Sequence, residues 1–80
     1  MLRLRKKEIK DGVIYYYYQK EGKGEWGLLY YNPTTEERGF VQLAEGDRKE
    51  DPRYRNHAVY RIKEYIRNNN FPEKDLVAWG

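Results

Sequence analysis

Residues 13–20 read Val-Ile-Tyr-Tyr-Tyr-Tyr-Gln-Lys, and this run predicts a β-strand with aromatic rings on both of its faces. Successive side chains of a strand point to opposite faces of the sheet, so Tyr15 and Tyr17 share one face while Tyr16 and Tyr18 share the other. Tyrosine suits both environments, because its ring is apolar and its hydroxyl group can reach water or a hydrogen-bond partner. The segment therefore predicts a sheet with two aromatic surfaces.

Turn-forming residues around this strand predict an antiparallel meander. Asp11-Gly12 precedes the tyrosine strand, and Asp-Gly between two β-forming runs is a strong hairpin signal. Residues 21–24 (Glu-Gly-Lys-Gly) form the next turn, and residues 32–35 (Asn-Pro-Thr-Thr) open a longer one. The four predicted strands are residues 3–10, 13–20, 26–31 and 39–43.

The turns also predict how the strands align. A two-residue turn at Asp11-Gly12 pairs Ile9 with Ile14, and we further expect Tyr30 to oppose Phe40. One predicted face then carries Ile9, Ile14, Tyr16, Tyr18, Leu29, Tyr31, Val41 and Leu43. The other predicted face carries Tyr15, Tyr17, Trp26, Leu28, Tyr30, Phe40 and Gln42.

The second half of the chain predicts one amphipathic helix over residues 52–69. Asp51-Pro52 is a typical helix start, and Asn68-Asn69-Asn70 before Phe71-Pro72 is a typical end. Apolar residues recur at helical spacing between these limits. The residues expected to be buried against the sheet are Ala58, Ile62, Tyr65 and Ile66.

These elements predict a single small α+β domain over residues 1–80, a four-stranded antiparallel meander with one helix packed on one face. The apolar segment 76–79 is expected to dock on the domain or to add a fifth, edge strand. Four strands span about 20 Å and one helix is about 10 Å wide, so a single helix can cover only one face. We expect the more aliphatic face to take the helix and the aromatic face to stay uncovered.

An uncovered aromatic face predicts a non-enzymatic interaction module. A patch of several rings has the size that marks an interaction site on a monomer, and a homodimer or another protein partner is the first expectation. Tyrosine is also enriched at interface hot spots, which adds Tyr60 on the polar side of the helix. The predicted interaction residues are Tyr15, Tyr17, Trp26, Tyr30, Phe40 and Tyr60.

Single-strand nucleic-acid binding is the alternative prediction. Rings on a sheet beside lysine and arginine are the usual components of such sites. The first predicted strand supplies four basic residues, Arg3, Arg5, Lys6 and Lys7. The overall balance is only +3, from 16 Lys and Arg against 13 Asp and Glu. Basic residues on an edge strand also serve to prevent edge-to-edge aggregation, so both interpretations stay open.

Catalysis, cofactors and membrane insertion are not expected. The chain has no cysteine and no serine, and its single histidine, His57, has no carboxylate three or four residues away on the helix. We interpret His57 as an ordinary solvated side chain, and we expect no cofactor and no metal site. No apolar run has the length of a membrane span or a signal peptide, so a cytoplasmic protein is predicted.

Overall fold

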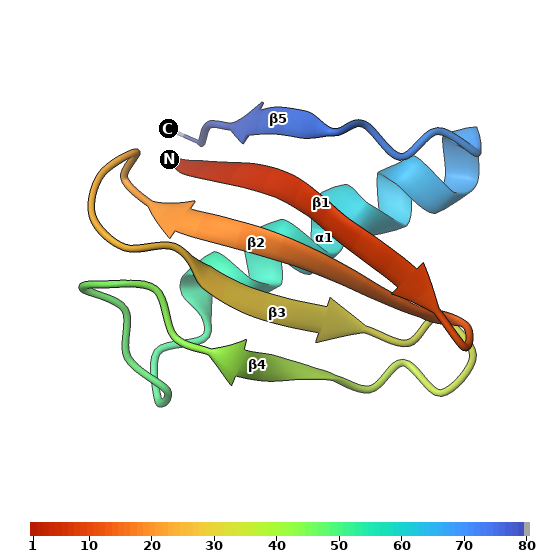
Figure 1. The fold of residues 1–80 in the computed structure, drawn as a ribbon, viewed down its shortest axis with the longest axis horizontal. Helices are drawn as coiled ribbons and strands as arrows, with labels where there is room; N and C mark the ends of the chain where they lie inside the picture. The colour runs from red at the N-terminus through yellow and green to blue at the C-terminus, as the bar shows by residue number, and fades with distance from the viewer. Residues whose placement is uncertain (80) are drawn as a thin grey trace.

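The fold is a five-stranded antiparallel sheet with one helix, seen in a computed structural model that describes residues 1–79. The elements are β1 (Leu2–Lys10), β2 (Val13–Lys20), β3 (Gly27–Tyr31), β4 (Arg38–Gln42), α1 (Arg53–Asn68) and β5 (Lys74–Val77). The strand order is β4-β3-β2-β1-β5, so the last strand pairs with the first (Figure 1). The predicted α+β meander and its additional C-terminal edge strand are confirmed.

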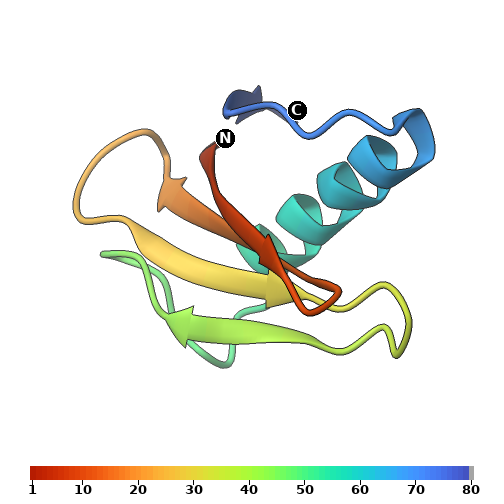
Figure 2. The same cartoon turned by 45° about the vertical axis from the view of Figure 1, so that its right-hand side comes forward.

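The sheet has one covered and one uncovered face. Helix α1 crosses one face diagonally, and no other described element lies on the opposite side (Figures 1 and 2). We call this opposite side the open face. The two faces have different compositions because side chains alternate along each strand.

The tyrosine run divides between the two faces as predicted. Tyr16 and Tyr18 on the covered face are fully buried, while Tyr15 and Tyr17 are half-buried on the open face. No polar or charged residue is buried in the part of the chain that the structure describes. The buried core consists of Leu2, Leu4, Ile14, Tyr16, Tyr18, Leu29, Tyr31, Ala44, Tyr54, Ala58, Val59, Ile62, Tyr65 and Val77.

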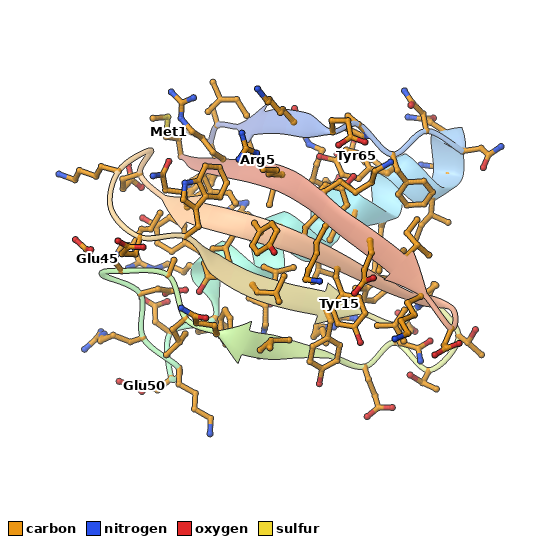
Figure 3. The ribbon with its side chains drawn as sticks, in the orientation of Figure 1. Met1, Arg5, Tyr15, Glu45, Glu50 and Tyr65 are labelled. Carbon is orange, nitrogen blue, oxygen red and sulfur yellow. The ribbon has the colours of Figure 1, made fainter. Side chains whose placement is uncertain are left out.

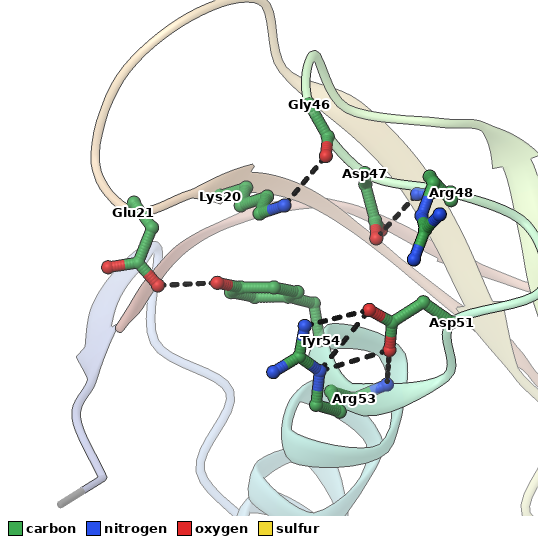
Figure 4. Close-up of polar contacts among 8 residues, drawn as sticks. All are labelled: Lys20, Glu21, Gly46, Asp47, Arg48, Asp51, Arg53 and Tyr54. Atoms are coloured by element: carbon green, nitrogen blue, oxygen red, sulfur yellow. Dashed lines mark hydrogen bonds and ion pairs between the residues drawn. The ribbon is translucent and has the colours of Figure 1, made fainter.

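The buried tyrosines use their hydroxyl groups to hold the irregular segments of the chain. Tyr16 donates to the carbonyl oxygen of Pro72 at 2.8 Å, and Tyr18 donates to the carboxylate of Asp47 at 2.6 Å. Tyr54 donates in the same way to the carboxylate of Glu21 (Figure 4). These bonds fix the C-terminal segment, the β4–α1 loop and the β2–β3 turn to the core.

The same tyrosines predict a loss of stability at high pH. Burial raises the pKa of Tyr16, Tyr18 and Tyr65 well above the ordinary value of 10, and the hydrogen bond to Glu21 helps to raise the pKa of Tyr54 to about 12. Above pH 10 the unfolded chain therefore releases protons that the folded chain retains, so rising pH favours unfolding.

Circular dichroism and the near-ultraviolet absorbance of tyrosinate, followed together against pH, test this expectation. Loss of structure should begin above pH 10 and should coincide with a cooperative step in tyrosinate formation. Full ionisation of all nine tyrosines with the fold intact would contradict it.

The predicted alignment of β3 with β4 is wrong by one residue. Tyr30 opposes Gly39, and Phe40 opposes Leu29 on the covered face. The ring of Phe40 lies 5.7 Å from that of Tyr18 and packs against the core. The reason lies at Gly39: a Cβ atom there would sit 2.9 Å from the hydroxyl oxygen of Tyr30, so only glycine lets that ring lie across β4.

The shift also changes the environment of the residues that follow. An irregularity in the pairing at Leu28 and Leu29 accommodates the extra residue in β4. Val41 and Leu43, expected under the helix, are 58% and 37% exposed at the edge of the sheet.

The helix and the tail differ from expectation in two side chains. Ile66 is 36% exposed rather than buried, because the buried stripe runs through Tyr54, Val59 and Ile62 instead. His57 is half-buried rather than freely solvated: its ring stacks on Trp79 at 3.8 Å with 9° between the planes. The prediction that the tail packs back on the domain is confirmed by this contact and by β5.

Candidate functional site

The middle of the open face is an aromatic row supplied by β2 and by β3 with the residue just before it. Tyr15, Tyr17, Trp26 and Tyr30 are half-buried there, with Leu28 between them. The register places Tyr15 opposite Tyr30, and their ring centroids are 6.4 Å apart. Their faces are therefore partly accessible while their positions are fixed by the pairing of two central strands.

A basic row lies beside the aromatic row on β1 and β5. Leu2 and Leu4 point into the core, so Arg3 and Arg5 point to the open face. Lys74 opposes Arg5 across the β1–β5 pair and adds a third cation to the same face. No ion pair forms at any of these three side chains within residues 1–79.

The two rows meet at Trp26. The guanidinium carbon of Arg5 lies 5.7 Å from the centre of the Trp26 ring, which is a cation–π arrangement. Arg5 and Tyr15 both project from the helix-free side of the sheet (Figure 3). Lys74 was not among the predicted residues, because its place depends on the pairing of β5 with β1.

A bulge in β1 separates the two neighbouring lysines. The pairing shifts between Lys6 and Glu8, which leaves Lys7 as the extra residue. Lys6 turns to the covered side, where its ammonium nitrogen donates to the carbonyl oxygen of Phe71 at 3.3 Å. Lys7 pairs with Glu8 at 3.2 Å, and this hydrogen bond raises the pKa of its ammonium group. Lys6 is thus removed from the predicted basic set on the open face.

Among the described residues, one hollow lies at each end of the aromatic row on the open face. The first has a volume of about 450 Å³ and is lined by Trp26, Leu76 and the three cations of the basic row. Asp75 also borders it, but this carboxylate is already bound to Tyr65 and Arg61. The second has about 280 Å³ and is lined by Val13, Tyr15, Tyr30, Asn32, Glu37 and Val41.

Two predicted interaction residues lie elsewhere. Phe40 is turned to the covered face and packs against the core. Tyr60 is 68% exposed on the outer side of α1, beside Asn56 and His57, and does not reach the open face. The four remaining predicted aromatic residues and two of the predicted cations, Arg3 and Arg5, do lie together.

Neither a metal centre nor a membrane-spanning helix occurs among the described residues. Within residues 1–79 there is no group of three or more His, Asp or Glu side chains that could hold a metal ion. In that part of the chain no helix is both long enough and apolar enough to cross a membrane.

No family model, no curated protein and no solved structure matches this chain. Function is therefore inferred from the chemistry of the surface.

Proposed function

We propose that the chain is a non-enzymatic binding module whose open face takes single-stranded nucleic acid. The observation that carries the proposal is the adjacency of the two rows: stacking rings on β2 and β3 lie next to the three cations of the basic row on β1 and β5. Rings provide a stacking surface for bases, and cations beside them neutralise the phosphates.

The hollow at Trp26 has the composition that one nucleotide requires. Its lining includes the indole ring of Trp26 together with the three cations Arg3, Arg5 and Lys74. A base stacked on Trp26 would bring its phosphate among these cations. Because Arg5 already lies over the indole ring, it is placed to interact with a stacked base as well as with a phosphate.

Self-association through the same face is the rival function. An uncovered aromatic surface favours it, and the exposed Val41 and Leu76 extend the apolar area. Two features weigh against it. Phe40 is no longer part of the patch, and the three cations of the basic row would lose hydration in an apolar interface. An anionic ligand compensates these charges, so we rank nucleic acid first.

Binding of a labelled single-stranded pyrimidine oligonucleotide, measured by fluorescence anisotropy, tests the proposal. Neutralising three phosphates of a single strand gives a slope of about −2 for log K against log salt concentration. Trp26→Ala is expected to weaken binding about tenfold, since stacking of one base contributes roughly 1–3 kcal/mol. Tyr60→Ala is the matched control and should leave the affinity unchanged, because Tyr60 lies away from the open face.

The outcomes separate the two functions. Two results would show that the rings do not stack bases. One is equal affinity for single-stranded and double-stranded oligonucleotides, and the other is an equal loss of affinity in Trp26→Ala and Tyr60→Ala. A chain that binds no oligonucleotide and forms a dimer that persists at high salt would favour self-association instead.

A further inference from the structure

A second surface lies along the outer edge of β4 and shares Tyr30 and Val41 with the open face. The edge of β4 that faces away from β3 has no strand partner among the described residues. Beside it runs a groove of about 540 Å³ whose opposite wall is formed by the β4–α1 loop and the first turn of α1. The lining residues are Tyr30, Arg38, Gly39, Phe40, Val41, Gln42, Leu43, Lys49 and Arg55.

The charge of this groove is of one sign. Its lining contains three cations, Arg38, Lys49 and Arg55, and no carboxylate. Arg38 pairs with Glu36 at 3.7 Å, whereas no ion pair forms at Lys49 or Arg55 within residues 1–79. The groove therefore carries two cations that no described carboxylate neutralises.

Arg55 contributes a hydrogen-bond donor without a partner to this groove. Its Nε atom is buried and has no hydrogen-bond partner, and it is the only such side-chain atom in residues 1–79. The guanidinium carbon lies 5.9 Å from the centre of the Phe40 ring, so the group is held over the covered side of β4. A buried donor without a partner is unfavourable, and an incoming carboxylate would relieve this cost.

Hydrogen bonds to the core and to β2 hold the β4–α1 loop, which forms one wall of the groove. The amide of Ala44 donates to the hydroxyl oxygen of Tyr18 at 3.0 Å, and Tyr18 donates to Asp47. Lys20 donates to the carbonyl oxygen of Gly46 at 2.6 Å (Figure 4). Because this loop is already ordered, binding of a ligand does not carry the entropy cost of ordering it, and this favours affinity.

We propose that the β4 groove binds an extended acidic peptide segment of a partner protein, which adds a strand to the sheet. The unpaired backbone of β4 supplies the hydrogen bonds for a new strand, as in other proteins that bind peptides at a sheet edge. Acidic side chains of the peptide would face Arg55 and Lys49, and the alternate apolar side chains would pack on Val41 and Leu43.

Two other occupants fit the groove less well. Pairing of β4 with β4 of a second copy would place the cations of both copies against each other, since the β4 sequence Arg-Gly-Phe-Val-Gln contains no acid. Nucleic acid would find no free ring to stack on at the covered side, because Phe40 packs against the core.

The probe is a capped, labelled peptide of about six residues in which glutamate and valine alternate. Its binding to the full chain, measured by anisotropy, should be lost when lysine replaces glutamate or when proline replaces valine. Proline keeps the charge of the peptide but removes the N–H groups that a ladder requires. Amide hydrogen exchange of β4 should slow in the complex, while exchange in β5, the other edge, should not.

Lys49→Glu is the main variant, and Lys10→Glu is its matched control. Both residues are exposed and both changes alter the net charge equally, so neither should disturb the fold. Lys49→Glu is expected to weaken peptide binding about tenfold, and Lys10→Glu should change it by less than about twofold. Arg55→Gln should weaken peptide binding at least as much as Lys49→Glu does. If replacement of the half-buried Arg55 impairs folding, the exposed Lys49→Glu variant still tests the proposal.

Three results would overturn the proposal. The first is equal affinity for the glutamate–valine peptide and for the peptide in which proline replaces valine, which would indicate charge attraction without strand addition. The second is protection of β5 instead of β4. The third is displacement of the peptide by a single-stranded oligonucleotide whose own binding is reduced by Lys49→Glu, which would make the groove part of the nucleic-acid surface.

Discussion

A chain that ends at Asn70 is expected to show no cooperative thermal unfolding. The deletion removes β5, including Val77, which is 5% exposed and pairs with Leu2. It also removes Trp79, whose ring lies 5.4 Å from that of Tyr54. Trp79 is partly buried, so its loss costs at most the roughly 3–5 kcal/mol of a fully buried aromatic side chain, and loss of the valine adds about 1.5–3 kcal/mol. The sum is comparable to the whole stability of a small domain.

The deletion has a second, polar cost. The hydroxyl groups of Tyr16 and Tyr65 lose their acceptors, the carbonyl oxygen of Pro72 and the carboxylate of Asp75. Each unpaired group inside the core costs roughly 1–3 kcal/mol. Differential scanning calorimetry of the full and shortened chains measures the combined effect.

Leu76→Ala in the full chain is the control for this experiment. Leu76 belongs to the same strand but is 50% exposed, so its truncation should change stability by less than about 1 kcal/mol. This corresponds to a shift in the melting temperature of at most about 8 °C. A shortened chain that melts within that interval of the full chain would mean that β5 contributes little to the fold.

Ile62→Ala is expected to cost about 2–5 kcal/mol of unfolding free energy. Ile62 is 0% exposed and lies in the buried stripe of α1 beneath the sheet. Alanine is the better helix former, so the loss can be attributed to packing and not to helix propensity. Urea unfolding followed by circular dichroism gives the free energy.

Ile66→Ala is the matched control on the same helix. Ile66 is one turn further along and is 36% exposed, so the same change should cost less than about 1 kcal/mol. A similar loss at both positions would mean that α1 is rotated about its axis and turns Ile66 toward the sheet.

The sheet shows which parts of a register local sequence can predict. Asp11-Gly12 forms a two-residue turn, and such a turn leaves one alignment for its strands, so the pairing of Ile9 with Ile14 follows from the sequence. Tyr17 pairs with Leu28, but residues 21–26 connect those strands and the hydrogen-bonded turn there is centred on Glu21 and Gly22, so no two-residue turn sets that alignment. The predicted pairing of Ile9 with Ile14 is confirmed.

The turn between β3 and β4 does not have this property. It is longer, and its Asn32 side chain accepts from the amides of Thr34 and Thr35 while Glu36 adopts a positive φ of 63°. Nothing in these residues alone fixes how many of them belong to the loop. Contact between Tyr30 and Gly39 decides the register, and it also decides that Phe40 leaves the open face.

The candidate binding surfaces also combine features that local sequence predicts with features that tertiary contacts decide. Tyr15 and Tyr17 share a face for a reason visible in the sequence alone, because alternation along a strand is a local property of the backbone. The same alternation puts Lys6 on the covered side with Leu2 and Leu4, whereas Lys74 joins the open face only through the tertiary pairing of β5 with β1. Likewise, the β4 groove exists because a loop and a helix meet the sheet edge. Such contacts join residues far apart in the chain, and they depend on packing and hydrogen bonds that no local pattern encodes.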